Sequence, residues 1–286
     1  MTLRDVAGQA AVVTGAGSGI GRAIACRLGA DRMRLGLVAR THSALEETAS
    51  LVRDAGGEAL VLPCDLRDAD AVEATVRAAA TELGGLHALV NNAAVGAFWQ
   101  LDSTDVARFD DVLAANLRGA FACIQAALPH LRAAGSARIV NIASRAAQEG
   151  YPYLAAYSAS KHGLVGLSES VDAELEDTAI RCHTVIVGSV DTPFHTACFV
   201  DADPSLAPII AAGAGIDPGP AGRDPVGMLQ PDDVAEVVAF LLRLPDAIHV
   251  QPVVLRPSHD SGPADLGRIV RRGRAASGDS GPTAQD

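Results

Sequence analysis

A tyrosine and a lysine four residues apart carry the clearest chemical signal in the sequence. In a helix, Tyr157 and Lys161 share one face, one turn apart. An ammonium group beside a phenol favours the phenolate and lowers the tyrosine pKa from its usual value of about 10. Tyr157 would then exchange a proton near neutral pH, while Ser144, thirteen residues earlier, could hold a substrate oxygen beside it. On spacing alone, a pair that only decorates a surface remains the alternative.

A glycine-rich turn follows the first expected strand. Residues 14–21 read TGAGSGIG and precede a helical pattern. The spacing is not GxGxxG, because the sixth position counted from Gly15 is Ile20; it is GxxxGxG, at Gly15, Gly19 and Gly21. Glycines permit a tight turn and a close backbone approach to a pyrophosphate, whose charge then lies at a helix N-terminus. An ordinary loop between strand and helix is the alternative reading.

The end of the second expected strand bears on the choice of nucleotide. A dinucleotide site for NAD expects an acidic residue there to bind the ribose 2′-hydroxyl. This strand ends in LVARTHS, with Arg40 at its tip and no carboxylate. Because an arginine pairs with a 2′-phosphate, the sequence favours NADP (NADPH) over NAD. The alternative is that Arg40 points into solvent.

The elements that position these residues follow a regular alternation. Short apolar runs alternate with helical patterns such as 44–55 and 69–83, and the expected strands are 10–14, 34–39, 58–63, 87–92, 137–143, 181–187 and 251–256. This alternation predicts an α/β fold, a Rossmann-type doubly wound parallel sheet of about seven strands with helices on both faces. A composition of 49% hydrophobic but only 3% aromatic residues suits such a sheet.

Polar residues follow the third and fourth expected strands. Asp65 could hydrogen-bond an adenine edge or simply form a turn. Asn91 and Asn92 stand where parallel strands border a ligand crevice, although amides there can equally satisfy the strand's own backbone.

We expect residues 1–257 to form one nucleotide-binding domain and residues 258–286 a disordered tail. The Gly- and Pro-rich segment from about 192 to 230 is predicted to be a substrate loop. From it, Phe194, His195 and Phe199 could contact substrate or anchor the loop.

Several classes of partner are disfavoured. A net charge of −11 disfavours nucleic-acid binding. The five cysteines are scattered without a metal-ligand cluster, which predicts reduced thiols, no metal and a cytoplasmic protein. We find no signal-peptide pattern and no apolar stretch of membrane-spanning length, so we expect no membrane partner.

Taken together, the motifs resemble the short-chain dehydrogenase/reductase family. They are TGAGSGIG, NNAA at 91–94, Asn116, Ser144 and the run from Tyr157 to Lys161, in the family's order and spacing. The resemblance covers residues 8 to about 257. It implies an oxidoreductase that transfers a hydride between NADP(H) and a carbonyl or secondary alcohol substrate, most simply a ketone reductase.

The resemblance also implies a role for each matched position. Tyr157 would be the general acid or base, Lys161 would lower its pKa and bind the nicotinamide ribose, Ser144 would polarise the substrate oxygen, and Asn116 would hold a relay water. The residues implied to contact the cofactor are Gly15, Ser18, Gly19, Ile20, Gly21, Asp65, Leu66, Asn92, Ala93, Gly188, Val190 and Thr192. Substrate would lie among Ser144, Arg145, the stretch 148–154 and the loop after Thr192.

The sequence departs from the family pattern in four places. Val187 and Gly188 replace a usual Pro-Gly pair, and His87 stands where an acidic residue is common. The last strand ends in VVLRPS without a glycine pair, and Ser18 stands where many NADP-binding relatives carry a basic residue. An NAD-dependent alcohol dehydrogenase, an epimerase of the same fold and a non-catalytic dinucleotide-sensing module remain alternatives, although the complete catalytic set argues against the last. The helical patterns at 105–131 and 154–177 resemble those that pair subunits, so we expect a homodimer or homotetramer.

Overall fold

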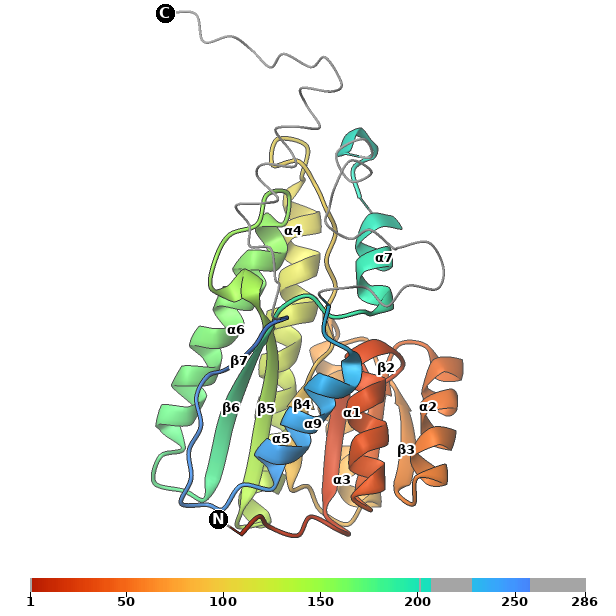
Figure 1. Ribbon diagram of the computed structural model, residues 1–286, viewed down its shortest axis with the longest axis vertical. Coiled ribbons are helices and arrows are strands. Elements are labelled where there is room, and N and C mark those ends of the chain that lie inside the picture. Colours follow the sequence, from red (N-terminus) through yellow and green to blue (C-terminus); the bar gives the residue numbers. More distant parts are fainter. Residues whose placement is uncertain (1, 201, 207–227, 258–286) are drawn as a thin grey trace, which may run out of the picture.

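The sheet is built as the alternation predicts. The computed structural model describes residues 2–200, 202–206 and 228–257. In this part of the chain, seven parallel strands pair in the order β3-β2-β1-β4-β5-β6-β7 (Figure 1). The strands are β1 (Ala10–Thr14), β2 (Arg34–Ala39), β3 (Glu58–Pro63), β4 (Ala88–Asn91), β5 (Ala137–Ser144), β6 (Ile180–Val187) and β7 (Val253–Leu255). The order reverses between β1 and β4, as in a doubly wound Rossmann-type sheet, which confirms the predicted fold class.

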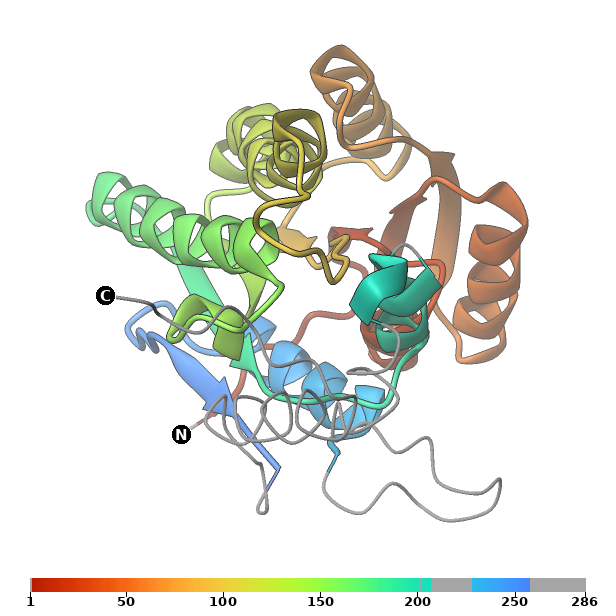
Figure 2. The same ribbon diagram turned by 90° about the horizontal axis from the view of Figure 1, so that it is seen from above.

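Helices cover both faces of the sheet (Figure 2). On one face, α1 (Gly19–Ala30), α2 (His42–Asp54) and α9 (Pro231–Leu242) pack on the strands through side chains such as Ile24, Leu45 and Val238. On the other face lie α3 (Ala69–Glu82), α5 (Gly119–Ala133) and α6 (Ala155–Glu174). Their apolar sides, with Val76 and Leu131, complete the second core layer. Because both faces are covered, the central strands are buried along their whole length.

The longest helical segment contains an irregular turn. It runs from α4 (Val106–Leu113) through a π-helical turn at Ala114–Arg118 into α5. By length and composition alone, Val106–Ala133 is apolar enough to cross a membrane. Its buried residues Ile124 and Leu131 nevertheless belong to the core layer that packs on the sheet, as in the core helix of a soluble protein.

The segment after β6 departs from the prediction. A loop was expected from Thr192 onward, but Pro193–Val200 forms helix α7, followed by a 3₁₀ turn at Pro204–Leu206. The expectation of a loop was wrong here because PFHTACFV has no glycine, and proline is favourable at the first position of a helix. The Gly- and Pro-rich residues 207–227 and the predicted tail 258–286 lie outside the described residues.

Candidate active site

A large cavity opens at the carboxyl ends of the central strands. Its volume is about 640 Å³, and its lining comes from the ends of β1, β2, β4, β5 and β6 together with α7. It therefore lies where the strand order reverses, the usual binding crevice of an open α/β sheet. Nearly all of the predicted site residues line it, namely Gly15, Ser18, Gly19, Ile20, Arg40, Asp65, Leu66, Asn92, Ala93, Ser144, Tyr157, Lys161, Gly188, Val190 and Thr192.

At Gly15 and Gly21, the glycine-rich turn has no room for a side chain. Gly15 and Gly19 have φ angles of 68° and 51°, a region that other residues rarely adopt. A Cβ at Gly15 would lie 2.7 Å from the Asn92 amide nitrogen, and one at Gly21 only 2.2 Å from the Gly15 carbonyl oxygen. Gly21 is not part of the cavity wall and instead lets helix α1 pack behind the turn. A bare backbone at a helix N-terminus fits the pyrophosphate of a dinucleotide.

Thr14 ties the glycine turn to the end of β4. Its hydroxyl oxygen accepts hydrogen bonds from the backbone N–H groups of Asn92 and Ala93, at 3.0 and 3.1 Å. The Asn92 amide donates to the Thr14 carbonyl oxygen at 3.0 Å. Asn91, by contrast, is buried away from the cavity and donates to the Asn141 side chain at 2.8 Å, so the suggestion that it borders the ligand was wrong.

The three reactive side chains converge at the other end of the cavity. Ser144 is the last residue of β5, while Tyr157 and Lys161 lie on the first turns of α6. The Ser144 hydroxyl accepts a hydrogen bond from the Ala146 N–H at 3.2 Å and lies close enough to the Tyr157 phenol to lower its pKa. The Lys161 Nζ donates to the Ile142 carbonyl oxygen at 2.8 Å and lies 5.8 Å from the centroid of the Tyr157 ring. This arrangement places two hydroxyl groups and an amine on one wall of the large cavity.

The predicted fall of the tyrosine pKa is not observed. Burial raises the pKa of the Tyr157 phenol above its ordinary value, and the nearby Ser144 hydroxyl offsets only part of that rise. Burial also lowers the pKa of Lys161 to about 8. The prediction was wrong because desolvation penalises the phenolate more than its surroundings stabilise it.

Asn116 lies in the π-helical turn and is almost fully buried, outside the cavity wall. Its carbonyl oxygen accepts from the Val95 N–H, and its amide donates to the Val95 carbonyl oxygen, both at 2.8 Å. The same amide donates to the Ser160 hydroxyl at 3.1 Å. Asn116 thus links the segment after β4 to α6, and its role in holding a water stays a prediction. Such π-helical turns often occur at functional sites.

The adenine end of the cavity holds two arginines. Arg40 lines it, as predicted, beside Asp65. The Asp65 carboxylate is engaged by Arg67, whose guanidinium lies 3.2 Å from one oxygen and also donates to Asp111 at 2.7 Å. Sequence reasoning missed Arg67, although a basic residue two positions after Asp65 was a visible signal.

Apolar and aromatic groups line the substrate end. Phe194 lines the cavity with its ring centroid 5.6 Å from that of Tyr157, a position that fits either a substrate contact or an anchor for the segment, so its role stays a prediction. The side chains of His195 and Phe199 lie outside the described residues. Arg145 lines the same end and forms an ion pair with Glu149. Cys198, a buried residue that sequence reasoning treated as ordinary packing, also lines the cavity.

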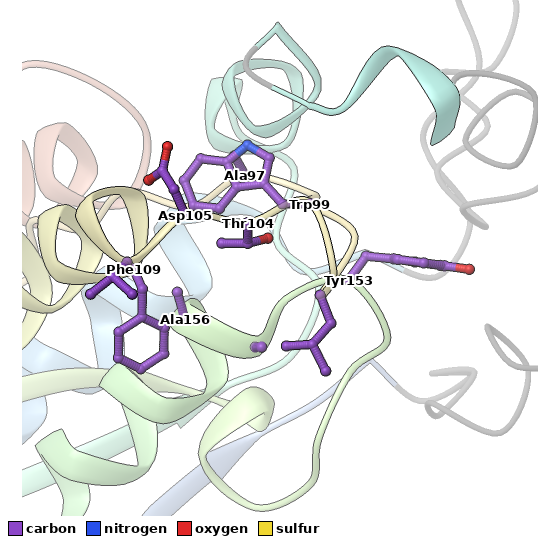
Figure 3. Close-up of a pocket in the computed structure, with 10 residues that line it drawn as sticks. Ala97, Trp99, Thr104, Asp105, Phe109, Tyr153 and Ala156 are labelled. Atoms are coloured by element: carbon purple, nitrogen blue, oxygen red, sulfur yellow. The ribbon is translucent and has the colours of Figure 1, made fainter.

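A second, smaller cavity of about 180 Å³ lies beside the first. Figure 3 shows its side chains, which come from the segment 97–109 and from the start of α6, among them Trp99, Phe109 and Tyr153. A hydrogen bond of 2.9 Å from the Trp99 N–H to the Tyr153 carbonyl oxygen joins two segments of its wall. None of the predicted catalytic residues lines it, so the chemistry belongs to the larger cavity. Among the residues that the structure describes, no group of His, Cys, Asp and Glu side chains could hold a metal ion.

Comparisons with known proteins agree with this geometry. The family model for short chain dehydrogenase matches residues 9–202. The chain belongs to this family. Levodione reductase of Leifsonia aquatica is 34% identical over 247 residues, which cover 85% of this chain and 90% of that protein.

Solved structures of short-chain dehydrogenases share the fold. An alcohol dehydrogenase from Thermococcus sibiricus, complexed with 5-hydroxy-NADP, is 27% identical with a TM-score of 0.75 and covers 89% of this chain and 98% of that one. A short chain dehydrogenase from Mycobacterium paratuberculosis bound to NAD is 27% identical with a TM-score of 0.73, covering 91% and 99%. The chain is therefore a dehydrogenase or reductase acting on CH–OH or ketone groups, with a fold that binds NAD or NADP.

Proposed function

We propose that this protein is an NADP(H)-dependent ketone reductase in which Tyr157 is the general acid. The observation that carries the proposal is that the Ser144 and Tyr157 hydroxyl groups lie together at one end of a cavity whose other end holds Arg40. A ketone oxygen between the two hydroxyls would meet one group that holds it and one that protonates it. The nicotinamide ring, when bound, supplies the hydride to the carbonyl carbon.

The protein's own groups supply the proton and its electrostatic support. The raised pKa keeps the Tyr157 phenol protonated at neutral pH, the state that a proton donor needs. Tyr157 gives its proton to the substrate oxygen while the Ser144 hydroxyl holds that oxygen in place. The Lys161 amine, with a pKa of about 8, is mostly charged at pH 7 and stabilises the phenolate that this transfer leaves. In the direction of alcohol oxidation, the same phenolate accepts the proton.

The preference for NADP rests on Arg40. Arg40 follows β2 and lines the cavity. In sites for NAD, this position holds a carboxylate that binds the ribose 2′-hydroxyl. Asp65, the nearest acidic group of the adenine wall, is paired with Arg67. An arginine in this place can bind a 2′-phosphate through two parallel hydrogen bonds.

The experiment is a titration of the purified protein with NADPH and with NADH, followed by nucleotide fluorescence. Wild-type protein should bind NADPH more tightly, and Arg40→Ala should remove most of that preference. Arg53→Ala is the matched control, because Arg53 lies on α2, bonds the Ala59 carbonyl oxygen and does not line the cavity. Equal or tighter NADH binding would show that the assignment to NADP is wrong. A panel of cyclic and acyclic ketones with the preferred nucleotide then tests the reaction.

We also infer that the protein works as a homo-oligomer, a homodimer or a homotetramer. Val106 on α4 and Phe121 on α5 are 74% and 47% exposed and lie in the segment whose helical pattern resembles those that pair subunits. Size-exclusion chromatography with light scattering, for wild type and Phe121→Asp, tests this. The free cysteines Cys26, Cys64, Cys123, Cys182 and Cys198 support a reducing, cytoplasmic location, which stays a prediction.

A further inference from the structure

The carbonyl groups of the glycine turn are held from behind by two side chains. Thr48, on α2, is fully buried, and its hydroxyl donates to the Ala16 carbonyl oxygen at 2.9 Å. Arg22, on α1, donates from Nη2 to the Gly17 carbonyl oxygen at 2.6 Å and from Nε to the Thr48 hydroxyl at 3.1 Å. One connected network therefore fixes two consecutive peptide groups of the turn.

This network determines where the turn's N–H groups point. The described residues contain no cis peptide bond, so each carbonyl and the N–H of the next residue point in opposite directions. With the carbonyls of Ala16 and Gly17 turned toward α1 and α2, the N–H groups of Gly17 and Ser18 point the other way. Gly17 and Ser18 both line the large cavity. Successive N–H groups oriented in this way are what an anionic phosphate binds.

Further contacts hold the side chains of Arg22 and Thr48 in place. The same Arg22 Nη2 that donates to Gly17 also pairs with Glu47 at 2.9 Å, which holds the arginine across the two helices. The Thr48 hydroxyl also lies 3.0 Å from the Ala44 carbonyl oxygen, one turn back on its own helix. The fully buried Thr48 hydroxyl thus has hydrogen-bond partners, as buried polar groups require.

We propose that Thr48 and Arg22 are positioning residues for the dinucleotide, which act by orienting the N–H groups of the glycine turn toward its phosphates. They contact the turn and not the nucleotide, since neither lines the cavity. Because the pyrophosphate is common to both nucleotides, they affect NADPH and NADH alike. Arg40, by contrast, would distinguish the two.

The test compares Thr48→Val with Thr48→Ser by fluorescence titration with NADPH and NADH at low temperature. Valine keeps the shape of threonine but leaves the Ala16 carbonyl and the Arg22 Nε without their shared partner, while serine keeps the hydroxyl. We expect Thr48→Val to weaken both nucleotides by about tenfold, equivalent to about 1.4 kcal/mol, without changing their ratio. Thr48→Ser should stay within about twofold of wild type. A purely structural role would lower the melting temperature but leave the Kd of the folded protein unchanged.

Arg22→Ala provides a second route if Thr48→Val does not fold, because Arg22 is about one-third exposed. Its matched control is Arg27→Ala on the same helix, where Arg27 pairs with Asp31 and Glu236, far from the turn. We expect Arg22→Ala to weaken both nucleotides equally and Arg27→Ala to weaken neither. Wild-type affinity for both nucleotides in folded Thr48→Val or Arg22→Ala would overturn the proposal.

Discussion

The Lys161 Nζ lies 5.8 Å from the centroid of the Tyr157 ring and donates its hydrogen bond to the Ile142 carbonyl oxygen. The amine is therefore anchored to β5 beside the phenol. At this separation an ammonium group stabilises a neighbouring phenolate through space, more strongly in a buried site than in water. The tyrosine can thus give up its proton to a substrate and still have a charged partner.

Replacing Tyr157 tests the proton donor directly. Tyr157→Phe should lower kcat for ketone reduction at least about 100-fold, because phenylalanine has no proton to give to the product oxygen. Nucleotide affinity should change less than about twofold, since the ring and its contact with Phe194 remain. Steady-state kinetics and fluorescence titration separate the two effects. Tyr153→Phe is the control, because Tyr153 lines only the smaller cavity. Activity near the wild-type rate in Tyr157→Phe would exclude the proposed acid.

The buried Lys161 should leave a signature in the pH dependence of stability. Its pKa falls from 10.5 to about 8 on burial, so the folded protein loses this proton before the unfolded chain does. Below pH 8 the buried charge costs stability, and between pH 8 and 10.5 that cost is progressively removed. The free energy of unfolding of wild type relative to Lys161→Met should therefore rise with pH in this window, by about 1 kcal/mol per pH unit.

Denaturant titrations of both proteins between pH 7 and 10 measure that difference. The comparison with the variant matters because the buried cysteines titrate in the same range with the opposite sign. Burial raises the pKa of Cys123 and Cys182 to about 12, which removes stability as the pH rises above 9 in both proteins. A difference that stays constant from pH 7 to 10 would show that burial does not lower the pKa of Lys161.

Much of the fold and the site could be predicted from the sequence, because strands, helices and the glycine turn depend mainly on residues that are close together in the chain. Apolar runs separated by helical patterns located the strands, and the glycines that permit close packing located the turn after β1. The positions matched by family resemblance then converge on one cavity, with Gly21 and Asn116 lying behind its wall.

The features that the sequence did not predict depend on the direction in which a side chain points and on how deeply it is buried. Asn91 and Asn92 are adjacent and identical in type, yet strand alternation turns only Asn92 to the cavity. The pKa of Tyr157 depends on how much water its phenol loses, which spacing along the chain does not encode. Helix α7 was hidden because the glycines that follow it dominated the composition of the segment.

The base of the sheet contains a buried arginine whose partner should be essential for stability. Arg138 is 1% exposed and donates to the Leu244 carbonyl oxygen at 2.7 Å and to the Asp246 carboxylate at 2.8 Å. Asp246→Asn should lower the free energy of unfolding by about 2–3 kcal/mol, because it leaves a buried charge without its counterion. Glu236→Gln, which breaks the more exposed pair with Arg27, should cost less than about 1 kcal/mol.

The same pair should make stability depend on acidity. Burial raises the pKa of Asp246, but the hydrogen bonds from Arg138 and Ser136 outweigh it and hold that pKa below its usual value. The stability from the ionised carboxylate is present above the unfolded pKa near 3.8 and is lost as the pH falls through the lower, folded pKa. Urea denaturation of wild type and Asp246→Asn from pH 7 downward should therefore show the two curves converging. Parallel curves would contradict the assigned ion pair.

Gly96 should control how Tyr157, the proposed general acid, packs against Phe194 and Cys198. A Cβ on Gly96 would lie 3.1 Å from Tyr157 Cδ2, 3.3 Å from Phe194 Cζ and 3.4 Å from Cys198 Sγ, closer than most carbon contacts. Gly96→Ala should lower kcat about tenfold, because a shift of even a fraction of an ångström in the acid is costly, while nucleotide affinity should be unchanged. Gly166→Ala is the control, since that glycine lies on the same helix as Tyr157 with open space around it. Phe194→Ala should make room for the added methyl group. The Gly96→Ala substitution should therefore lower kcat much less when it is made in Phe194→Ala than when it is made in the wild type. No recovery in the double variant would mean that the methyl group acts on something other than this packing.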